Sequence, residues 1–208
     1  LAAMWKSAYY APNTLMELEY AQARRQGQDG AVTFSDGQVL NPATPLGRKL
    51  WTKSWLPYAG WHFGVLPALY APLGPIAVAN VAINSLLAEL VTNLHTFTII
   101  TTNHAGDDMC RFEGKVSSKA HWQLRQVLGS VNFRTGGDVN DFLHGWLNYQ
   151  IEHHVWPDLS MLQYQQVQPA VKALCEAHSV PYAQENVFMR LKKTLAIMTG
   201  HASMAHGP

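Results

Sequence analysis

The segment from Ser54 to Gly106 reads SWLPYAGWHFGVLPALYAPLGPIAVANVAINSLLAELVTNLHTFTIITTNHAG and contains a single charged residue, Glu89. A transmembrane helix needs about 20 mostly apolar residues to cross a hydrocarbon core of about 30 Å. The segment divides at Ala71-Pro72-Leu73-Gly74-Pro75, which is a strong turn signal. We therefore predict two transmembrane helices, at 54–71 and 75–103. A buried helical hairpin in a soluble core is the alternative.

The residues that flank this segment agree with a membrane hairpin. Aromatic residues gather near its ends, as they do at membrane interfaces: Trp51, Trp55, Tyr58, Trp61 and Tyr70. Basic residues precede and follow the pair of helices, whereas the turn between them is uncharged: Arg24, Arg25, Arg48, Lys49, Lys53, Arg111, Lys115, Lys119 and Arg125. The positive-inside rule then predicts an integral membrane protein with both flanks in the cytoplasm. We expect no disulfide between Cys110 and Cys175 in that compartment.

The composition excludes two other classes of protein. Charged residues make up 14% of the 208 residues and the formal net charge is +1. A disordered chain would carry more charge and fewer apolar residues. A nucleic-acid-binding protein would show a strongly basic patch or stripe, so we expect no nucleic acid partner.

The rest of the chain is predicted to be mostly helical. Apolar spacing and capping residues predict helices at 13–26, 118–128, 138–154, 160–178 and 187–199. A β-hairpin is predicted where residues 31–34 and 38–40 flank Ser35-Asp36-Gly37. The predicted fold class is all-α, with a transmembrane helical hairpin at 54–103 and a cytoplasmic helical cap at 104–199. Residues 1–53 form a cytoplasmic segment and residues 200–208 a tail.

The stretch Gln150-Ile151-Glu152-His153-His154 is the first candidate for chemistry. On a helix, Gln150, His153 and His154 share one face, because positions i, i+3 and i+4 lie together. Two imidazoles and a carboxamide on one face suit an iron or zinc site. Glu152 and Asp158 are predicted to accept hydrogen bonds from the imidazole N–H groups and so to orient them.

His104 is the second candidate, because it follows the second predicted transmembrane helix on the cytoplasmic side. On a regular helix, His104 and Asn93 differ by only about 20° in direction, so we place Asn93 beside the metal site. His95 lies about 180° away and is predicted not to bind metal. No ligand role is predicted for the remaining isolated or tail histidines His62, His121, His178, His201 and His206.

The stretch from Asn148 to Asp158, NYQIEHHVWPD, resembles the third histidine box of membrane fatty acid desaturases in its QxxHH form. Leu94 to Ile100 followed by His104 resembles the last membrane helix of that family. Gly129-Ser130-Val131-Asn132-Phe133 is similar to its GS-x-NF stretch. Its C-terminal helices are matched by Pro169-Ala170-Val171, Leu174-Cys175 and Pro181-Tyr182. The likeness covers about residues 50–190.

The resemblance implies a di-iron enzyme that uses O₂ and two electrons to remove two hydrogens from an acyl chain. It implies His104, His153 and His154 as iron ligands, with no catalytic residue beyond the metal ligands. Gln150 takes the place of the first histidine of the box, and we expect it to act through water or another ligand. The implied partners are an acyl-CoA or acyl-lipid substrate, membrane lipid, and an electron donor such as a cytochrome b-type protein or a ferredoxin.

The family also uses two earlier boxes, HxxxH and HxxHH, and neither spacing occurs in residues 1–208. We therefore expect the chain to be the C-terminal part of a desaturase, with an incomplete di-iron centre and no activity alone. The alternatives are a lipid hydroxylase or ketolase on the same scaffold, a non-catalytic membrane protein with a relict box, and a soluble helical metal-binding protein.

Overall fold

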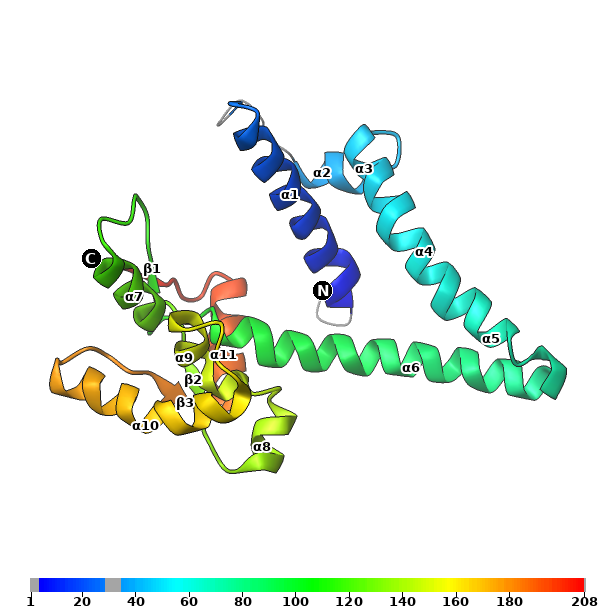
Figure 1. Ribbon diagram of the computed structural model, residues 1–208. Helices are drawn as coiled ribbons and strands as arrows, with labels where there is room; N and C mark the ends of the chain where they lie inside the picture. The colour runs from blue at the N-terminus through cyan, green and yellow to red at the C-terminus, as the bar shows by residue number, and fades with distance from the viewer. Residues whose placement is uncertain (1–3, 29–34, 208) are drawn as a thin grey trace. The chain divides into compact units, whose positions relative to one another are not determined.

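The computed structural model describes residues 4–28 and 35–207, and they are mostly helical, as predicted (Figure 1). The chain divides into two compact units, one up to His95 and one from Thr96 onwards. We call them the N-terminal unit and the C-terminal unit. The candidate histidines His104, His153 and His154 all belong to the C-terminal unit.

The N-terminal unit begins with helices that surround a small apolar core. Its first elements are the π-helical segment η2 (Trp5–Tyr10), α1 (Ala11–Arg25), α2 (Asp36–Leu40) and α3 (Pro45–Leu50). Val39, Leu46 and Leu50 form the core, and partly buried side chains of α1 pack against it. The predicted helix at 13–26 is therefore confirmed, and it begins two residues earlier.

The predicted hairpin is wrong at its second arm. Gln38, Val39 and Leu40 lie in α2 and not in a strand. The reason is a capping box: the Ser35 side chain accepts a hydrogen bond from the Gln38 backbone, and the Gln38 side chain accepts one from the Ser35 backbone. This reciprocal pair initiates a helix. The predicted first arm, residues 31–34, lies outside the described residues.

The first predicted transmembrane segment is helical but irregular. Short pieces follow one another here: η3 (Trp51–Trp55), α4 (Leu56–Ala59), η4 (Gly60–Val65), α5 (Leu66–Ala68) and η5 (Ala71–Leu73). Pro57 and Pro67 have no N–H to donate, and each π-helical piece ends shortly before one of them. The structure therefore does not form one regular helix over 54–71.

Helix α6 (Pro75–Ile100) corresponds to the second predicted transmembrane helix and has 26 residues. With the 3₁₀ turn η6 (Thr101–Asn103), it is the one helix in the described chain that is long and apolar enough to cross a membrane. Its most apolar window has a mean hydropathy of 1.5, and 0% of that window is buried. A long, apolar and exposed helix of this kind is consistent with a membrane span.

The C-terminal unit surrounds two short parallel pairs of strands. Strand β1 (Cys110–Arg111) pairs with β4 (Ala205–His206), and β2 (Asn132–Phe133) pairs with β3 (Gln184–Glu185). The helical elements are α7 (Lys119–Leu128), α8 (Asp138–Leu143), η7 (Leu147–Tyr149), α9 (Gln150–Val155), α10 (Met161–Ala177) and α11 (Val187–Met198). Ile151, Val171 and Cys175 form the apolar core between α9 and α10. The two cysteines are free.

Three of the predicted helices are confirmed with boundaries close to those expected. Helices α7, α10 and α11 start after Ser118, Ser160 and Asn186, and each of these side chains caps its helix by accepting a backbone hydrogen bond.

The prediction of one helix at 138–154 is wrong. Gly145 and Trp146 both have φ of +57°, which ends a right-handed helix and separates α8 from α9.

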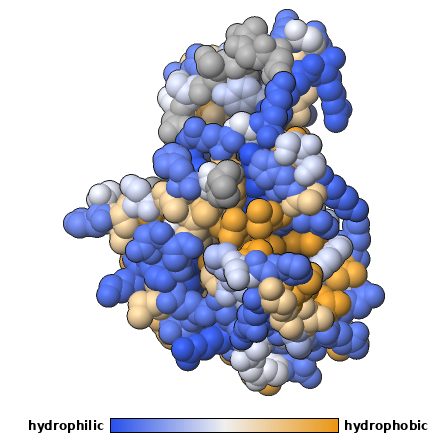
Figure 2. All heavy atoms as spheres, turned by 90° about the vertical axis from the view of Figure 1, so that its left-hand side faces the viewer, coloured by the Kyte–Doolittle hydropathy of each residue, from blue (hydrophilic) through white to orange (hydrophobic). Residues whose placement is uncertain are grey.

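The surface retains apolar side chains outside α6 as well. In the C-terminal unit Leu162, Leu174 and Phe188 are 61%, 58% and 79% exposed. Figure 2 draws one face of the molecule and shows hydrophobic residues in orange gathered among hydrophilic ones in blue.

Candidate metal centre

Helix α9 presents the side chains of the histidine box. It covers Gln150–Val155, so the predicted shared face of Gln150, His153 and His154 lies within one regular helix. Gln150 is buried, and the two histidines are partly buried. The left-handed residue Trp146 lies just before η7 and α9. A bulky side chain in that conformation is strained, and strain of this kind is typical of functional sites.

His104 comes from a different element and reaches the same site. Helix α6 ends at Ile100, and the 3₁₀ turn η6 precedes His104. The predicted alignment of His104 with Asn93 on one regular helix is therefore wrong, because a 3₁₀ turn rotates each residue further than an α-helix does. The Asn103 side chain donates a hydrogen bond to the Leu147 carbonyl at 2.8 Å and so joins this turn to the segment before α9.

The three predicted ligands and Gln150 lie close together. The ring centroids of His104 and His154 are 5.0 Å apart, and those of His153 and His154 are 5.9 Å apart. The Gln150 Nε2 atom lies 3.3 Å from His104 Nε2. The structure thus brings together, within one unit, residues that are up to 50 positions apart in the sequence.

Both histidines of the box contact a neighbour through Nδ1. His153 Nδ1 lies 3.1 Å from the Tyr164 hydroxyl, and His154 Nδ1 lies 3.2 Å from Gln126 Oε1. A hydrogen bond at Nδ1 fixes the orientation of the imidazole ring. The other ring nitrogen, Nε2, then points away from the hydrogen-bonding neighbour. Gln126 and Tyr164 were not predicted from the sequence, since they lie on other helices.

Burial and neighbouring rings favour the neutral imidazole at His104 and His154. Burial, together with the nearby His104 and His153 rings, lowers the pKa of His154 to about 4. Burial and His153 also lower the pKa of His104. A neutral imidazole has a lone pair for a metal, whereas a protonated one does not. At neutral pH, His104 and His154 are therefore already in the form that binds metal.

Glu152 does not have the predicted role. It is fully buried, and its oxygens accept hydrogen bonds from Asn132 Nδ2 at 2.8 Å and from the Tyr182 hydroxyl at 2.7 Å. It follows Gln150 by two positions on α9, so it points about 160° away, into the core. Burial raises the pKa of Glu152, and the two hydrogen bonds oppose that rise. Asp158 is exposed, and its role beside an imidazole stays a prediction.

The network around Glu152 should stabilise the C-terminal unit. We expect Tyr182→Phe to lower the free energy of unfolding by about 1–3 kcal/mol, because Tyr182 donates to Glu152 and accepts from Asn132 and Gln168. Chemical denaturation followed by circular dichroism measures the change. Tyr10→Phe is the matched control, because Tyr10 is 59% exposed, and we expect a change within about 0.5 kcal/mol. Equal effects of the two variants would contradict the prediction.

Asp141 is a second buried carboxylate that the sequence did not reveal. It accepts hydrogen bonds from the Asn148 side chain, from the Tyr149 hydroxyl at 2.8 Å and from Gln165 Nε2 at 2.5 Å. These contacts join α8, η7 and α10 next to the histidine box. The only available signal was the spacing of seven and eight positions from Asp141 to Asn148 and Tyr149, and the break at Gly145 obscures it.

Asn93, which was predicted to lie beside the metal, takes part in a polar cluster of the N-terminal unit. Its Oδ1 accepts from the Lys6 backbone at 2.7 Å, and its Nδ2 donates to Glu89 Oε1 at 2.6 Å. Lys6 Nζ also lies 2.9 Å from Glu89 Oε2, and the Tyr58 hydroxyl donates to the same oxygen. Polar residues on an apolar helix are normally paired in this way. A role for Asn93 at the metal stays a prediction.

The side-chain oxygens and nitrogens of this site can be compared with the ligands that an iron ion needs. Gln150 Oε1 and Asn103 Oδ1 are buried, and neither has a hydrogen-bond partner among the described residues. Buried unpaired oxygens are costly, and in native proteins they indicate a further ligand or ion. However, no group of three or more His, Cys, Asp and Glu side chains within 4–28 and 35–207 is arranged to hold a metal. The residues therefore fit part of an iron site and not a closed one.

Comparison with known proteins gives the class of protein. A family model described as "Fatty acid desaturase" matches residues 19–186, which is more than half of the chain. The chain therefore belongs to the fatty acid desaturase family. No solved structure matches it.

Several curated relatives are similar to parts of the chain. An NADPH-dependent stearoyl-CoA 9-desaturase of Mycobacterium tuberculosis is 37% identical over 36% of this chain and 18% of its own length. A Delta(5) fatty acid desaturase of Caenorhabditis elegans is 30% identical over 50% of this chain and 22% of its own length. An acyl-lipid (8-3)-desaturase of Physcomitrium patens is 30% identical over 70% of this chain and 30% of its own length. The chain thus spans less than a third of each of these relatives.

Proposed function

We propose that this chain forms the C-terminal part of the active site of a membrane di-iron fatty acid desaturase, which introduces a double bond into an acyl chain. The observation that carries the proposal is the convergence of His104, His153 and His154 in a chain of the desaturase family. Gln150, which has a buried unpaired oxygen among the described residues, supports it.

Each residue has a defined task in this proposal. His104, His153 and His154 would hold iron, the last two through Nε2, because Tyr164 and Gln126 contact their Nδ1 atoms. Iron, when bound, supplies the O₂ chemistry that breaks an unactivated C–H bond, for which a side chain has no acid–base route. Two electrons from a donor protein complete the balance: O₂, two electrons and two protons, with the two hydrogens removed from the chain, give two molecules of water.

An apolar groove beside His153 supports the proposal that the substrate is an acyl chain. It has a volume of about 650 Å³ and is lined by Trp146, Leu147, Leu159, Met161 and Leu162, with His153 and Tyr164 at its wall. An apolar lining of this kind suits a hydrocarbon chain. The substrate would be an acyl-CoA or an acyl-lipid, and the electron donor a cytochrome b-type protein or a ferredoxin.

Three imidazoles are too few for two iron ions, so further ligands are needed. The spacings HxxxH and HxxHH do not occur in residues 1–208. In our proposal these ligands come from a longer polypeptide that carries both boxes. We call a polypeptide that carries both boxes together with residues 1–208 the complete desaturase.

Analysis of the product tests the proposed function. The complete desaturase is expressed in a host with defined lipids, and the fatty acids are analysed by gas chromatography with mass spectrometry. A desaturase yields a product that is lighter by two hydrogens and has gained no oxygen. A product that gains oxygen would indicate the hydroxylase or ketolase alternative. The absence of any product, with iron bound, would indicate a relict site.

The membrane topology is tested separately by cysteine accessibility. We expect cysteines at Arg48 and Asp107 to be labelled from the cytoplasmic side and a cysteine at Leu73 from the opposite side. The background carries Cys110→Ser and Cys175→Ser, so that each variant has a single thiol. The expectation follows from the basic flanks and the apolar helix α6. If Arg48 is labelled together with Leu73, residues 54–71 do not cross the membrane.

A further inference from the structure

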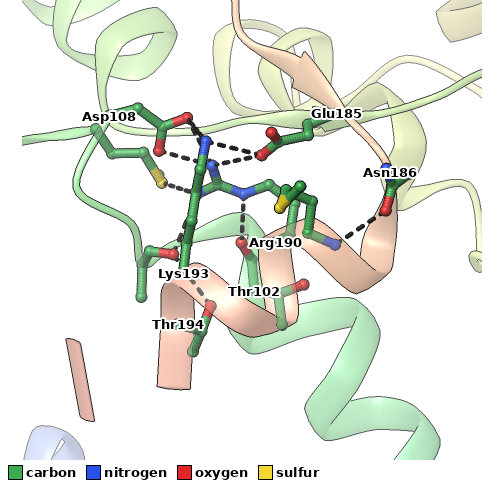
Figure 3. Close-up of polar contacts among 10 residues, drawn as sticks. Thr102, Asp108, Glu185, Asn186, Arg190, Lys193 and Thr194 are labelled. Carbon is green, nitrogen blue, oxygen red and sulfur yellow. Dashed lines mark hydrogen bonds and ion pairs between the residues drawn. The ribbon is translucent and has the colours of Figure 1, made fainter. Parts of the chain in front are cut away.

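Arg190 on α11 contacts the turn that carries His104. Its side chain is fully buried, with 0% exposed. Arg190 Nε donates to the Thr102 carbonyl at 3.2 Å, and Nη2 donates to the Ala105 carbonyl at 3.1 Å. Thr102 and Ala105 lie on either side of His104 in the sequence. Figure 3 shows the guanidinium extended from α11 toward this turn.

The positive charge of the Arg190 guanidinium is balanced by two acidic residues, Asp108 and Glu185. Arg190 Nη1 lies 2.6 and 2.8 Å from the two Asp108 oxygens and 3.4 Å from Glu185 Oε2. Lys193 Nζ contacts the same two carboxylates at 2.8 and 2.9 Å. Burial opposes the ionisation of Asp108, but the hydrogen bonds from Arg190 and Lys193 outweigh it and lower the pKa of that carboxyl. A buried guanidinium needs such pairing to be tolerated.

Two further residues fit this contact. Thr194 lies one turn after Arg190 on α11, is fully buried, and donates its hydroxyl to the Ala105 carbonyl at 3.1 Å. A Cβ atom on Gly106 would lie 2.3 Å from Arg190 Nη2, so only a glycine allows the guanidinium to approach the turn this closely. The Ala105 carbonyl thus accepts hydrogen bonds from both α11 residues.

We infer that Arg190 is a positioning residue for His104, and that Thr194 assists it. By fixing the carbonyls on both sides of His104, they aim its imidazole at Gln150 and His154. The inference rests on the proposed function, in which His104 binds iron. Only the rigid fork of an arginine can reach two carbonyls and a carboxylate at once, so a lysine cannot replace it.

The test measures the affinity of the complete desaturase for iron(II) by competition with a chelator. We expect Arg190→Lys and Thr194→Val to weaken iron binding about 10–100-fold, because residues that orient a ligand typically have effects of this size. Thr194→Ser keeps the hydroxyl and should retain the affinity. Lys193→Ala is the matched control, since Lys193 contacts the carboxylates but donates no hydrogen bond to the turn carbonyls. The Mössbauer spectrum of bound ⁵⁷Fe should change in Thr194→Val and not in Lys193→Ala.

His104→Ala is measured beside these variants to separate the two hypotheses. If His104→Ala keeps iron with unchanged affinity, the proposed ligand set fails, and the inference fails with it. If His104→Ala loses iron while Arg190→Lys and Thr194→Val keep the original affinity and spectrum, the inference alone is overturned. It is also overturned if Lys193→Ala weakens iron binding as much as Thr194→Val. If Arg190→Lys does not fold, the comparison of Thr194→Val with Thr194→Ser decides.

Discussion

His154→Ala in the complete desaturase should abolish desaturation and remove most of the iron from one metal position. The His154 ring is close to both other histidines, with its centroid 5.0 Å from that of His104 and 5.9 Å from that of His153. Its pKa of about 4 keeps it neutral, so that it binds metal without first losing a proton at physiological pH. An alanine offers no donor atom and leaves Gln126 without its ring contact. Iron per polypeptide and turnover are the two measurements.

The contrast with other histidines makes this expectation specific. His153→Ala should behave like His154→Ala, whereas His95→Ala should keep its iron. His178→Ala is a further control, because His178 is exposed and follows the last turn of α10. Loss of iron in the His95 variant equal to the loss in His104→Ala would contradict the assignment of the ligands.

The local features of the fold were predictable from the sequence. Ser118, Ser160 and Asn186 each precede a helix and cap it, so the starts of α7, α10 and α11 follow from short-range chemistry. The apolar composition of α6 likewise needs no tertiary information. At Ser35 the turn signal of Asp36-Gly37 predicts a hairpin, but the capping box formed by Ser35 and Gln38 determines the structure.

The break between α8 and α9 could not be predicted from local propensity. Trp146 favours a helix or strand and not a left-handed conformation, so it adopts φ of +57° only because surrounding contacts stabilise that conformation. The Trp146 backbone donates a hydrogen bond to the Asp141 carbonyl at 2.8 Å, and the Asp141 side chain is held by residues of η7 and α10. Tertiary packing outweighs the helical pattern here.

The sequence groups two of the proposed ligands with Gln150, but it does not reveal their surroundings. Spacing within one helix was enough to group Gln150 with the two box histidines. Glu152, however, accepts from Asn132 and Tyr182, which lie 20 and 30 positions away. Arg190 reaches Thr102 over 88 positions. Contacts over such distances depend on the whole fold, and no pattern in a single sequence encodes them.

Gln150 is the member of the box whose role the structure makes most testable. Its Nε2 lies 3.3 Å from His104 Nε2, while its buried Oε1 has no hydrogen-bond partner among the described residues. An amide offers a metal only its oxygen, which is a poorer ligand for iron than an imidazole nitrogen. We therefore expect Gln150 to hold a water molecule or to orient His104, and not to bind iron as the histidines do.

Gln150→Ala in the complete desaturase should then leave iron largely bound and slow turnover about 10–100-fold, as is typical when a residue that orients a ligand is removed. Gln150→His restores a nitrogen donor at this position and should keep iron. Iron stoichiometry and turnover are measured together for both variants, with His153→Ala as the reference for a lost ligand. If Gln150→Ala loses as much iron as His153→Ala does, the amide oxygen binds iron directly, and the unpaired Oε1 is then explained as a ligand atom rather than as a water-holding group.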